Sequence, residues 1–317
     1  MNTTTSDPGK APVLFVTGFP RSGTTWTNSI FLHCFKCGFA NEIQFLLKFH
    51  KRLNSYGDLG VERNMDRLVS HLLADEYFRI LKKSYKVEIP KSELLGHIKS
   101  NTYADLSLAV LQAVALHLGK EIVGGKCPSL GWNLDAVYAM FPNAKVVHVV
   151  RDGRDCALSH YRMAWGFRNA YVAARRWLDY MQRTKATGER VGPAQYMEFR
   201  YEDLLKDPAS VLARLERFIL GREDAGIRSC ALAEIGDNGL CGNFDKWKSE
   251  MSLREQGIFE SEAGSMLGKL GYELTGRKHE VSVFEAGYWW LEDRLRRELR
   301  AWMRRLFPSI GEKRKVR

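Results

Sequence analysis

A short stretch near the start of the chain has the composition of an oxyanion-binding turn. Residues 13–26 read VLFVTGFPRSGTTW, an apolar run followed by a turn and then a second run that begins with threonines. The backbone N–H groups of such a turn and the positive end of the next helix dipole together bind anions. Gly18 and Gly23 have the spacing of a Walker A loop, but Thr24 occupies the position of its lysine. The cation is Arg21 instead, which argues against an ATPase or kinase, although a kinase-like loop with a degenerate lysine remains the alternative.

A second arginine is expected at the same edge of the fold. Residues 145–150 form a β-branched run that predicts a buried parallel strand, and Arg151 follows directly. Ligands of open α/β sheets bind beyond the carboxyl ends of the strands, so Arg151 should face the same crevice as Arg21. Its planar guanidinium presents paired donors to an oxyanion. The alternative is a solvated charge cluster in which Arg151 pairs with the acidic residues beside it.

These two segments resemble the donor site of sulfotransferases that use 3′-phosphoadenosine 5′-phosphosulfate. Residues 20–26, PRSGTTW, resemble the family's 5′-phosphosulfate loop, in which tyrosylprotein and many bacterial members have arginine and cytosolic members have lysine. The resemblance implies that the sulfate end of the donor is bound by Arg21, Ser22, Gly23, Thr24, Thr25 and Trp26. It also implies that Arg151 and Ser159, eight residues further along the next helix, bind the 3′-phosphate.

Two later segments fit the same family pattern. Residues 199–205, FRYEDLL, resemble the segment that packs beside the adenine, which implies a donor contact for Tyr201. Residues 242–248, GNFDKWK, resemble the basic loop that closes over the nucleotide, which implies donor contacts for Lys246, Trp247 and Lys248. This loop lacks the Arg-Lys-Gly triplet of cytosolic members, and two ordinary solvated lysines are the alternative.

Sulfuryl transfer to a hydroxyl requires a base. Cytosolic members use a histidine in a Lys-Thr-His segment that this chain lacks. The branch that includes the tyrosylprotein enzymes uses a glutamate after the first helix, and Glu42 resembles that residue. The rival base is His97. A further alternative is that Glu42 only complements a helix dipole.

Lys126 resembles the family lysine that lies near the bridging oxygen of the donor. It follows a short predicted strand at residues 121–123, and the two glycines before it permit close approach to a ligand. A cation there would stabilise the charge on the departing phosphate. The alternative is a solvated loop lysine.

The elements that must position these residues alternate along the chain. Strands are expected at residues 13–17, 121–123, 145–150 and 195–199, and helices at 61–83, 103–118, 170–183 and 209–220. This alternation predicts an α/β fold, a P-loop-type parallel sheet with helices on both faces in a single domain. We expect a flexible N-terminus at residues 1–10, the sulfotransferase domain at 11–280, and a basic amphipathic helix and tail at 281–317. The insert between Glu42 and Asn101 is expected to form the acceptor side, and its aromatic residues suit either an acceptor site or a helix core.

The positive charge is concentrated at the C-terminus. The net charge is +11, and residues 294–317 contain ten Lys or Arg and two Glu, which gives 10 − 2 = +8. Apolar residues recur at helical spacing from just before this segment into it, namely Phe284, Tyr288, Leu291, Leu295, Leu299, Trp302 and Leu306. A basic amphipathic helix of this kind suits an anionic membrane surface. Docking on the domain is the favoured alternative, and nucleic-acid binding is not expected because no zinc-finger or RNP segment is present.

Two of the six cysteines, Cys34 and Cys37, have the spacing of half a zinc site or of a redox pair. Cys34 and Cys37 have no second Cys pair at ligand distance in the sequence, so we expect them to pack as small apolar thiols. Residues 1–10 are polar, and no run of about eighteen apolar residues occurs, which favours a cytoplasmic protein, with peripheral attachment to a membrane as the alternative.

Taken together, the sequence predicts transfer of a sulfuryl group from 3′-phosphoadenosine 5′-phosphosulfate to an acceptor hydroxyl on a small molecule, lipid or carbohydrate. The transfer is expected to proceed by in-line displacement without a metal, because a sulfuryl group carries less charge than a phosphoryl group. The alternatives are a P-loop kinase and a nucleotide-binding, membrane-associated module without turnover.

Overall fold

Four parallel strands form the centre of the fold. The structure, a computed structural model, describes residues 12–237 and 243–306. Its sheet has the order β2-β1-β3-β4 and is parallel throughout. The strands are β1 (Leu14–Thr17), β2 (Gly124–Lys126), β3 (Lys145–Val150) and β4 (Tyr196–Arg200). The predicted parallel sheet is confirmed, and its four carboxyl ends lie at one edge.

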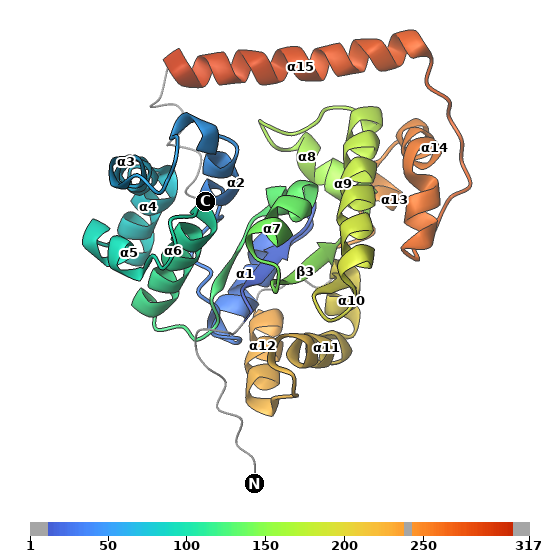
Figure 1. Cartoon of the computed structure of the whole chain (residues 1–317). Helices are drawn as coiled ribbons and strands as arrows, with labels where there is room; N and C mark the ends of the chain where they lie inside the picture. Colours follow the sequence, from blue (N-terminus) through green and yellow to red (C-terminus); the bar gives the residue numbers. More distant parts are fainter. Residues whose placement is uncertain (1–11, 238–242, 307–317) are drawn as a thin grey trace. The chain divides into compact units, whose positions relative to one another are not determined.

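Helices cover both faces of the sheet (Figure 1). Phe15 and Val146 belong to one buried cluster, which extends through the helices between residues 45 and 140. Val16 and Val147 belong to a second cluster on the other face, which includes residues of α1 (Thr24–His33), α11 (Pro208–Leu220) and α12 (Ala225–Asp237). Neighbouring strand residues point to opposite faces, so the uniformly apolar runs of β1 and β3 follow from burial on both sides.

The second strand begins later than the sequence predicts. The expected strand at residues 121–123 is wrong, because β2 is Gly124–Lys126. A Cβ on Gly124 would lie 1.8 Å from the carbonyl oxygen of Leu14, so only glycine can pair with β1 at this position. The register places Lys126 opposite Val16, just before the oxyanion turn.

The insert after Glu42 is a set of short helices. They are α2 (Phe45–His50), η1 (Leu53–Ser55), α3 (Glu62–Leu73), α4 (Glu76–Ile80), the π-helical η2 (Leu81–Tyr85) and α5 (Lys91–His97). The single helix predicted at residues 61–83 is broken at Asp75, whose side chain accepts a hydrogen bond from the Tyr77 N–H at 2.9 Å and caps α4. The aromatic residues considered for an acceptor site are all buried in the core, namely Phe45, Phe49, Tyr56, Tyr77 and Phe78.

The remaining helices complete the chain. They are α6 (Tyr103–His117), η3 (Pro128–Asn133), α7 (Leu134–Met140), α8 (Gly153–Tyr161), α9 (Ala170–Val191), α10 (Tyr201–Lys206), α13 (Trp247–Glu250), α14 (Leu253–Lys269) and α15 (Val283–Leu306). A helix is therefore present within the predicted C-terminal segment. The predicted N-terminus at residues 1–10 and the tail from residue 307 lie outside the described residues. In the described part of the chain, no helix is long and apolar enough to cross a membrane.

The chain forms two compact units. Within the described residues, the first comprises 12–151 and 183–237 and contains the sheet. The second comprises 152–182 and 243–306 and contains α8, α13, α14 and α15. The core of the second unit includes Trp177 and Phe259, whose ring centroids are 6.1 Å apart.

A disulfide connects two helices of the first unit. Cys34 at the end of α1 is bonded to Cys230 of α12, with the Cα atoms 5.6 Å apart. The expectation of a free thiol is therefore wrong for Cys34, whereas Cys37 is a buried free thiol. The two bonded residues are 196 positions apart, so spacing in the sequence could not indicate the pair.

Candidate functional site

The turn between β1 and α1 has an unusual backbone. Arg21 has φ 76° and Gly23 has φ 84°, both in the left-handed region. The Ser22 N–H donates to the Phe19 carbonyl at 2.9 Å and closes the turn. Left-handed non-glycine residues are uncommon and cluster at ligand sites. Turns of this kind expose successive N–H groups that form an anion-binding concavity.

The two glycines let this turn pack closely against its neighbours. A Cβ on Gly18 would lie 2.6 Å from the carbonyl oxygen of Val149 in β3. A Cβ on Gly23 would lie 2.5 Å from the ring of Tyr201, which follows β4. The turn is thus held against the ends of the two strands on one side of β1.

Arg151 extends from the end of β3 to the same turn. Its Nη1 donates to the Arg21 carbonyl at 3.0 Å, and its guanidinium lies 4.7 Å from the centroid of the Tyr201 ring. Arg151 is only 7% exposed. Hydrogen bonding and the aromatic face fix the orientation of this guanidinium. The structure therefore brings the two segments that carry Arg21 and Arg151 together.

Trp26, the third residue of α1, lies beside this cluster. Its ring meets Tyr201 edge-on at 5.8 Å between centroids. Its indole Nε1 is buried and has no hydrogen-bond acceptor among the described residues. Buried indole N–H groups normally find a partner, so an acceptor from a ligand would satisfy this one. In the turn itself, Ser22 and Thr24 are buried, and Thr25 is exposed.

The residues proposed as base and as leaving-group cation form an ion pair. Lys126 Nζ lies 2.9 Å from Glu42 Oε1. The backbone supports the pair, because the Ile43 N–H donates to the Lys126 carbonyl at 3.1 Å. Lys126 is 4% exposed, whereas the Glu42 side chain is 31% exposed. The other carboxylate oxygen of Glu42 accepts from Gln44 Nε2 at 2.9 Å, so the carboxylate is held in place and reachable from solvent.

His97 lies at the end of α5. Its Nδ1 donates to the Glu93 carbonyl of the same helix at 2.7 Å, and the residue is exposed. This contact connects His97 to its own helix. Its role as the rival base remains a prediction.

The other residues predicted to bind the sulfuryl donor belong to the second unit. Ser159 is on α8, and Lys246, Trp247 and Lys248 lie at the start of α13. Trp247 is buried, and its backbone N–H donates to Asp155 Oδ1 at 3.0 Å. Lys248 bonds Glu273 at 2.8 Å, which raises the pKa of the lysine. Their contacts with a donor remain predictions.

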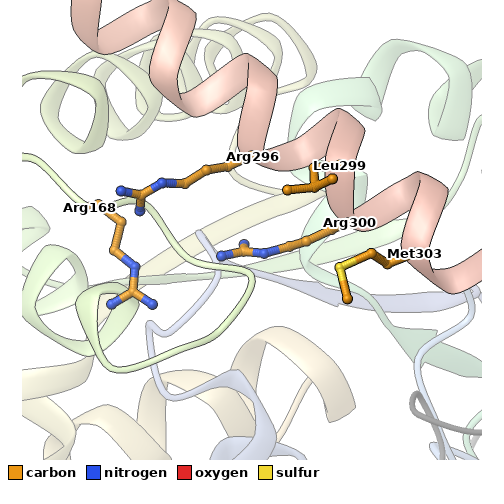
Figure 2. Close-up of a pocket in the computed structure, with 5 residues that line it drawn as sticks. All are labelled: Arg168, Arg296, Leu299, Arg300 and Met303. Carbon is orange, nitrogen blue, oxygen red and sulfur yellow. The ribbon is translucent and has the colours of Figure 1, made fainter.

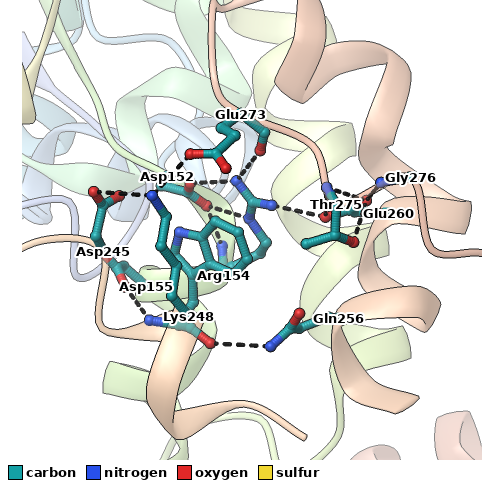
Figure 3. A network of polar contacts seen from close by, with 11 residues as sticks. Asp152, Arg154, Asp155, Asp245, Lys248, Gln256, Glu260, Glu273, Thr275 and Gly276 are labelled. Atoms are coloured by element: carbon teal, nitrogen blue, oxygen red, sulfur yellow. Dashed lines mark hydrogen bonds and ion pairs between the residues drawn. The ribbon is translucent and has the colours of Figure 1, made fainter. Parts of the chain in front are cut away.

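Arg154 organises this part of the second unit (Figure 3). It is fully buried, pairs with Asp152 at 2.7 Å and Glu260 at 2.8 Å, and lies 3.4 Å from the centroid of the Trp247 ring. The solvated charge cluster weighed from the sequence is not what forms, because Arg154 and Asp152 pair in a buried position. Sequence reasoning missed the role of Glu260, which is 106 residues away and carried no local signal.

Comparisons with known proteins show the family of the chain. A family model described as the sulfotransferase family matches residues 12–223. The sulfotransferase domain from the curacin biosynthetic pathway has a similar fold, with 19% identity, coverage of 83% of this chain and 99% of that chain, and a TM-score of 0.53. The sulfotransferase domain of the Synechococcus PCC 7002 olefin synthase gives 22% identity, coverage of 83% and 95%, and a TM-score of 0.49.

A curated relative from Aquifex aeolicus (strain VF5), described as uncharacterized, is 26% identical over 219 residues. The match covers 67% of this chain and 26% of that protein, so it spans about a quarter of the relative's length. The family model covers about two thirds of the chain, from the strand before the oxyanion turn to beyond α11. The chain therefore belongs to the sulfotransferase family.

Proposed function

We propose that this sulfotransferase uses 3′-phosphoadenosine 5′-phosphosulfate as donor and a hydroxyl compound as acceptor. The observation that carries the proposal is the meeting of three neighbouring strand ends. The Arg21 turn follows β1, Arg151 follows β3, and Lys126 ends β2 in contact with Glu42. An anion site beside a paired lysine and carboxylate suits transfer of an anionic group to a hydroxyl.

The residues of the first unit fit a donor of this chemistry. Arg21 and the N–H groups of the turn would hold the sulfate end, where the backbone conformation favours an anion. Arg151 supplies a second, oriented guanidinium next to the turn. The buried indole N–H of Trp26 lacks an acceptor in the described chain, and an adenine nucleotide carries several. Lys246, Trp247, Lys248 and Ser159 remain predicted donor contacts.

The donor, when bound, supplies a sulfuryl group whose sulfur bonds to the acceptor oxygen as its bond to the 5′-phosphate oxygen breaks. Glu42 takes the proton of the acceptor hydroxyl, and Lys126 stabilises the negative charge on the departing phosphate oxygen. The products are a sulfate ester and adenosine 3′,5′-bisphosphate. The 2.9 Å pair holds the carboxylate and the ammonium group side by side, where both roles need them.

The exposure of Glu42 supports access by the acceptor, because nearly a third of its side chain is open to solvent. A small molecule, a lipid or a carbohydrate could supply the hydroxyl. The five buried aromatic residues of the insert lie in the core, and they favour none of these classes.

Transfer of labelled sulfate to a panel of phenols, alcohols, sugars and lipids tests this function. The wild type should label at least one acceptor, and Glu42→Gln should reduce turnover by about a hundredfold or more while donor affinity changes little. Glu88→Gln is the matched control, since Glu88 forms a solvent-exposed pair with Lys82 at 2.8 Å. Unimpaired turnover by Glu42→Gln, with loss in His97→Ala, would transfer the role of base to His97. Donor binding without labelling of any acceptor would favour a module without turnover.

A further inference from the structure

Among the described residues, helix α15 is docked within the second unit through one face. The Trp289 ring contacts Tyr171 of α9 with 5.8 Å between centroids, and Trp290 lies 5.0 Å from the Arg176 guanidinium. Asp293, on the same face, is buried and pairs with Arg176. Two large aromatic residues and a buried carboxylate thus attach the helix to its own unit.

The opposite face of α15 is apolar and exposed. Its members recur every three or four residues, which places them on one side of the helix. They are Phe284, Tyr288, Leu291, Leu295, Leu299 and Trp302, each between 54% and 90% exposed, and we refer to them as the exposed stripe. The stripe extends along most of a 24-residue helix, about 36 Å long. A docked helix normally turns its apolar side to the core, so a continuous apolar stripe in solvent indicates a binding surface.

An arginine-lined pocket adjoins this stripe. It has a volume of about 510 Å³ and is lined by Arg168, Arg296, Leu299, Arg300 and Met303. Arg296 and Arg300 extend from α15 toward the segment that carries Arg168 (Figure 2). Glu292 pairs with Arg296 and offsets part of its charge. Three guanidinium groups at one pocket favour a phosphate or another oxyanion, and Leu299 belongs to both the pocket and the stripe.

We propose that α15 binds an anionic phospholipid surface, with the exposed stripe entering the boundary between headgroups and acyl chains. The arginine-lined pocket then receives a headgroup phosphate. Aromatic side chains at both ends of the stripe, Phe284 and Trp302, have the properties of membrane-interface residues. The charge of +8 over residues 294–317 adds attraction to the acidic lipid surface. This inference is independent of the proposed sulfuryl donor and acceptor.

Charge favours a lipid over a second copy of the chain. A dimer through the stripe would bring two segments of charge +8 together, and like charges at an interface oppose association. An anionic membrane instead supplies both the apolar layer for the stripe and the negative charge for the arginines. Nucleic acid supplies the charge but leaves six exposed apolar side chains unburied.

Flotation of the full chain with vesicles tests the proposal. The wild type should bind phosphatidylcholine vesicles that contain phosphatidylglycerol, should bind pure phosphatidylcholine weakly, and should dissociate as salt is raised. The double variant Leu291→Glu with Leu295→Glu should lose at least about tenfold in lipid affinity, because two apolar side chains no longer enter the membrane. The matched control is Leu116→Glu with Leu253→Glu, which adds the same charge at two exposed leucines outside α15 and should bind like the wild type.

A second variant tests the pocket without touching the stripe. Arg296→Gln with Arg300→Gln should weaken binding to anionic vesicles by about fivefold per arginine and leave the weak binding to neutral vesicles unchanged. Failure of the wild type to bind anionic vesicles, or equal binding by the stripe variant and its control, would overturn the proposal. A dimer detected by light scattering in the wild type and lost in the stripe variant would overturn it in favour of a second copy.

Discussion

At the scale of single residues, a variant of Trp26 can distinguish a ligand-binding role of its buried indole from a packing role. Trp26→Phe keeps an aromatic ring beside Tyr201 and removes the N–H that has no acceptor in the described chain. An unpaired buried donor costs about 1–3 kcal/mol, so the variant should be as stable as the wild type or more stable without ligand. Its affinity for adenosine 3′,5′-bisphosphate should fall by about fivefold, measured by calorimetry. Unchanged affinity with lower stability would make Trp26 a packing residue only.

Residue types identified much of the candidate site in advance, because a glycine-containing turn and an arginine after an apolar run are local patterns. The structure places Arg151 against the Arg21 turn, as the strand-end argument expected. The direct pairing of Glu42 with Lys126 could not be predicted, since 84 residues separate them. The packing of Trp247 against Arg154 could not be predicted from the sequence either, because Glu260 and Asp152, from different elements, fix the arginine.

At the scale of elements, a polar cluster joins β3, β4 and α9 and makes stability depend on pH. The buried His148 on β3 contacts the Tyr196 hydroxyl at 2.6 Å, and that hydroxyl donates to Glu198 at 3.1 Å. Lys185 of α9 bonds the same carboxylate at 2.6 Å. Burial alone would raise the pKa of Glu198, but the hydrogen bonds and charges of His148 and Lys185 outweigh it and lower that pKa to about 2. Burial lowers the pKa of His148, so Lys185 supplies the positive charge at neutral pH.

The sign of this pH dependence follows from the lowered pKa of Glu198. A carboxyl group with a folded pKa near 2 and an unfolded pKa of about 4.3 stabilises the fold above about pH 4.3, and this contribution is lost as pH falls toward 2. Lys185→Met should therefore lower the free energy of unfolding near neutral pH and have a much smaller effect at about pH 2. Urea unfolding of both proteins across this range measures the difference. A destabilisation of equal size at every pH would assign Lys185 a packing role only.

The alternation of strands and helices predicted the sheet because periodicity reports burial directly. Strand β3 matches its predicted range, whereas β2 does not, since pairing with β1 there requires the absence of a side chain on Gly124. The break before α4 was not predicted, because the run of residues there is helical in composition and only the capping bond of Asp75 interrupts it.

At the scale of the whole molecule, the Cys34–Cys230 disulfide makes stability depend on redox state. It closes a segment of 196 residues between α1 and α12, which restricts the unfolded chain. Cys230→Ser should lower the free energy of unfolding by about 2–4 kcal/mol, measured in urea without reductant. Reductant should destabilise the wild type and leave the variant unchanged. Full thiol reactivity of the unfolded wild type without reductant would show that the bond does not form.

The sequence analysis predicted one domain followed by a helix and did not predict the division into two compact units. The first segment of the first unit ends at Arg151, and the second unit begins with Asp152, although both residues belong to one short charged segment. Composition does not change at this point, so no local signal could have marked it. The residues predicted to bind the sulfuryl donor are consequently divided between the two units. Arg21 and Arg151 belong to the first unit, and Ser159 belongs to the second.

Calorimetric titration with adenosine 3′,5′-bisphosphate is the most direct test of the central claim, that the Arg21 turn and Arg151 together bind one doubly phosphorylated nucleotide. The wild type should bind it without magnesium and more tightly than adenosine 5′-monophosphate or magnesium ATP. Arg21→Ala and Arg151→Ala should each weaken binding by about tenfold or more. Arg190→Ala, which removes an exposed arginine paired with Asp135, should bind like the wild type. Preference for magnesium ATP, or unchanged affinity in both site variants, would contradict the account.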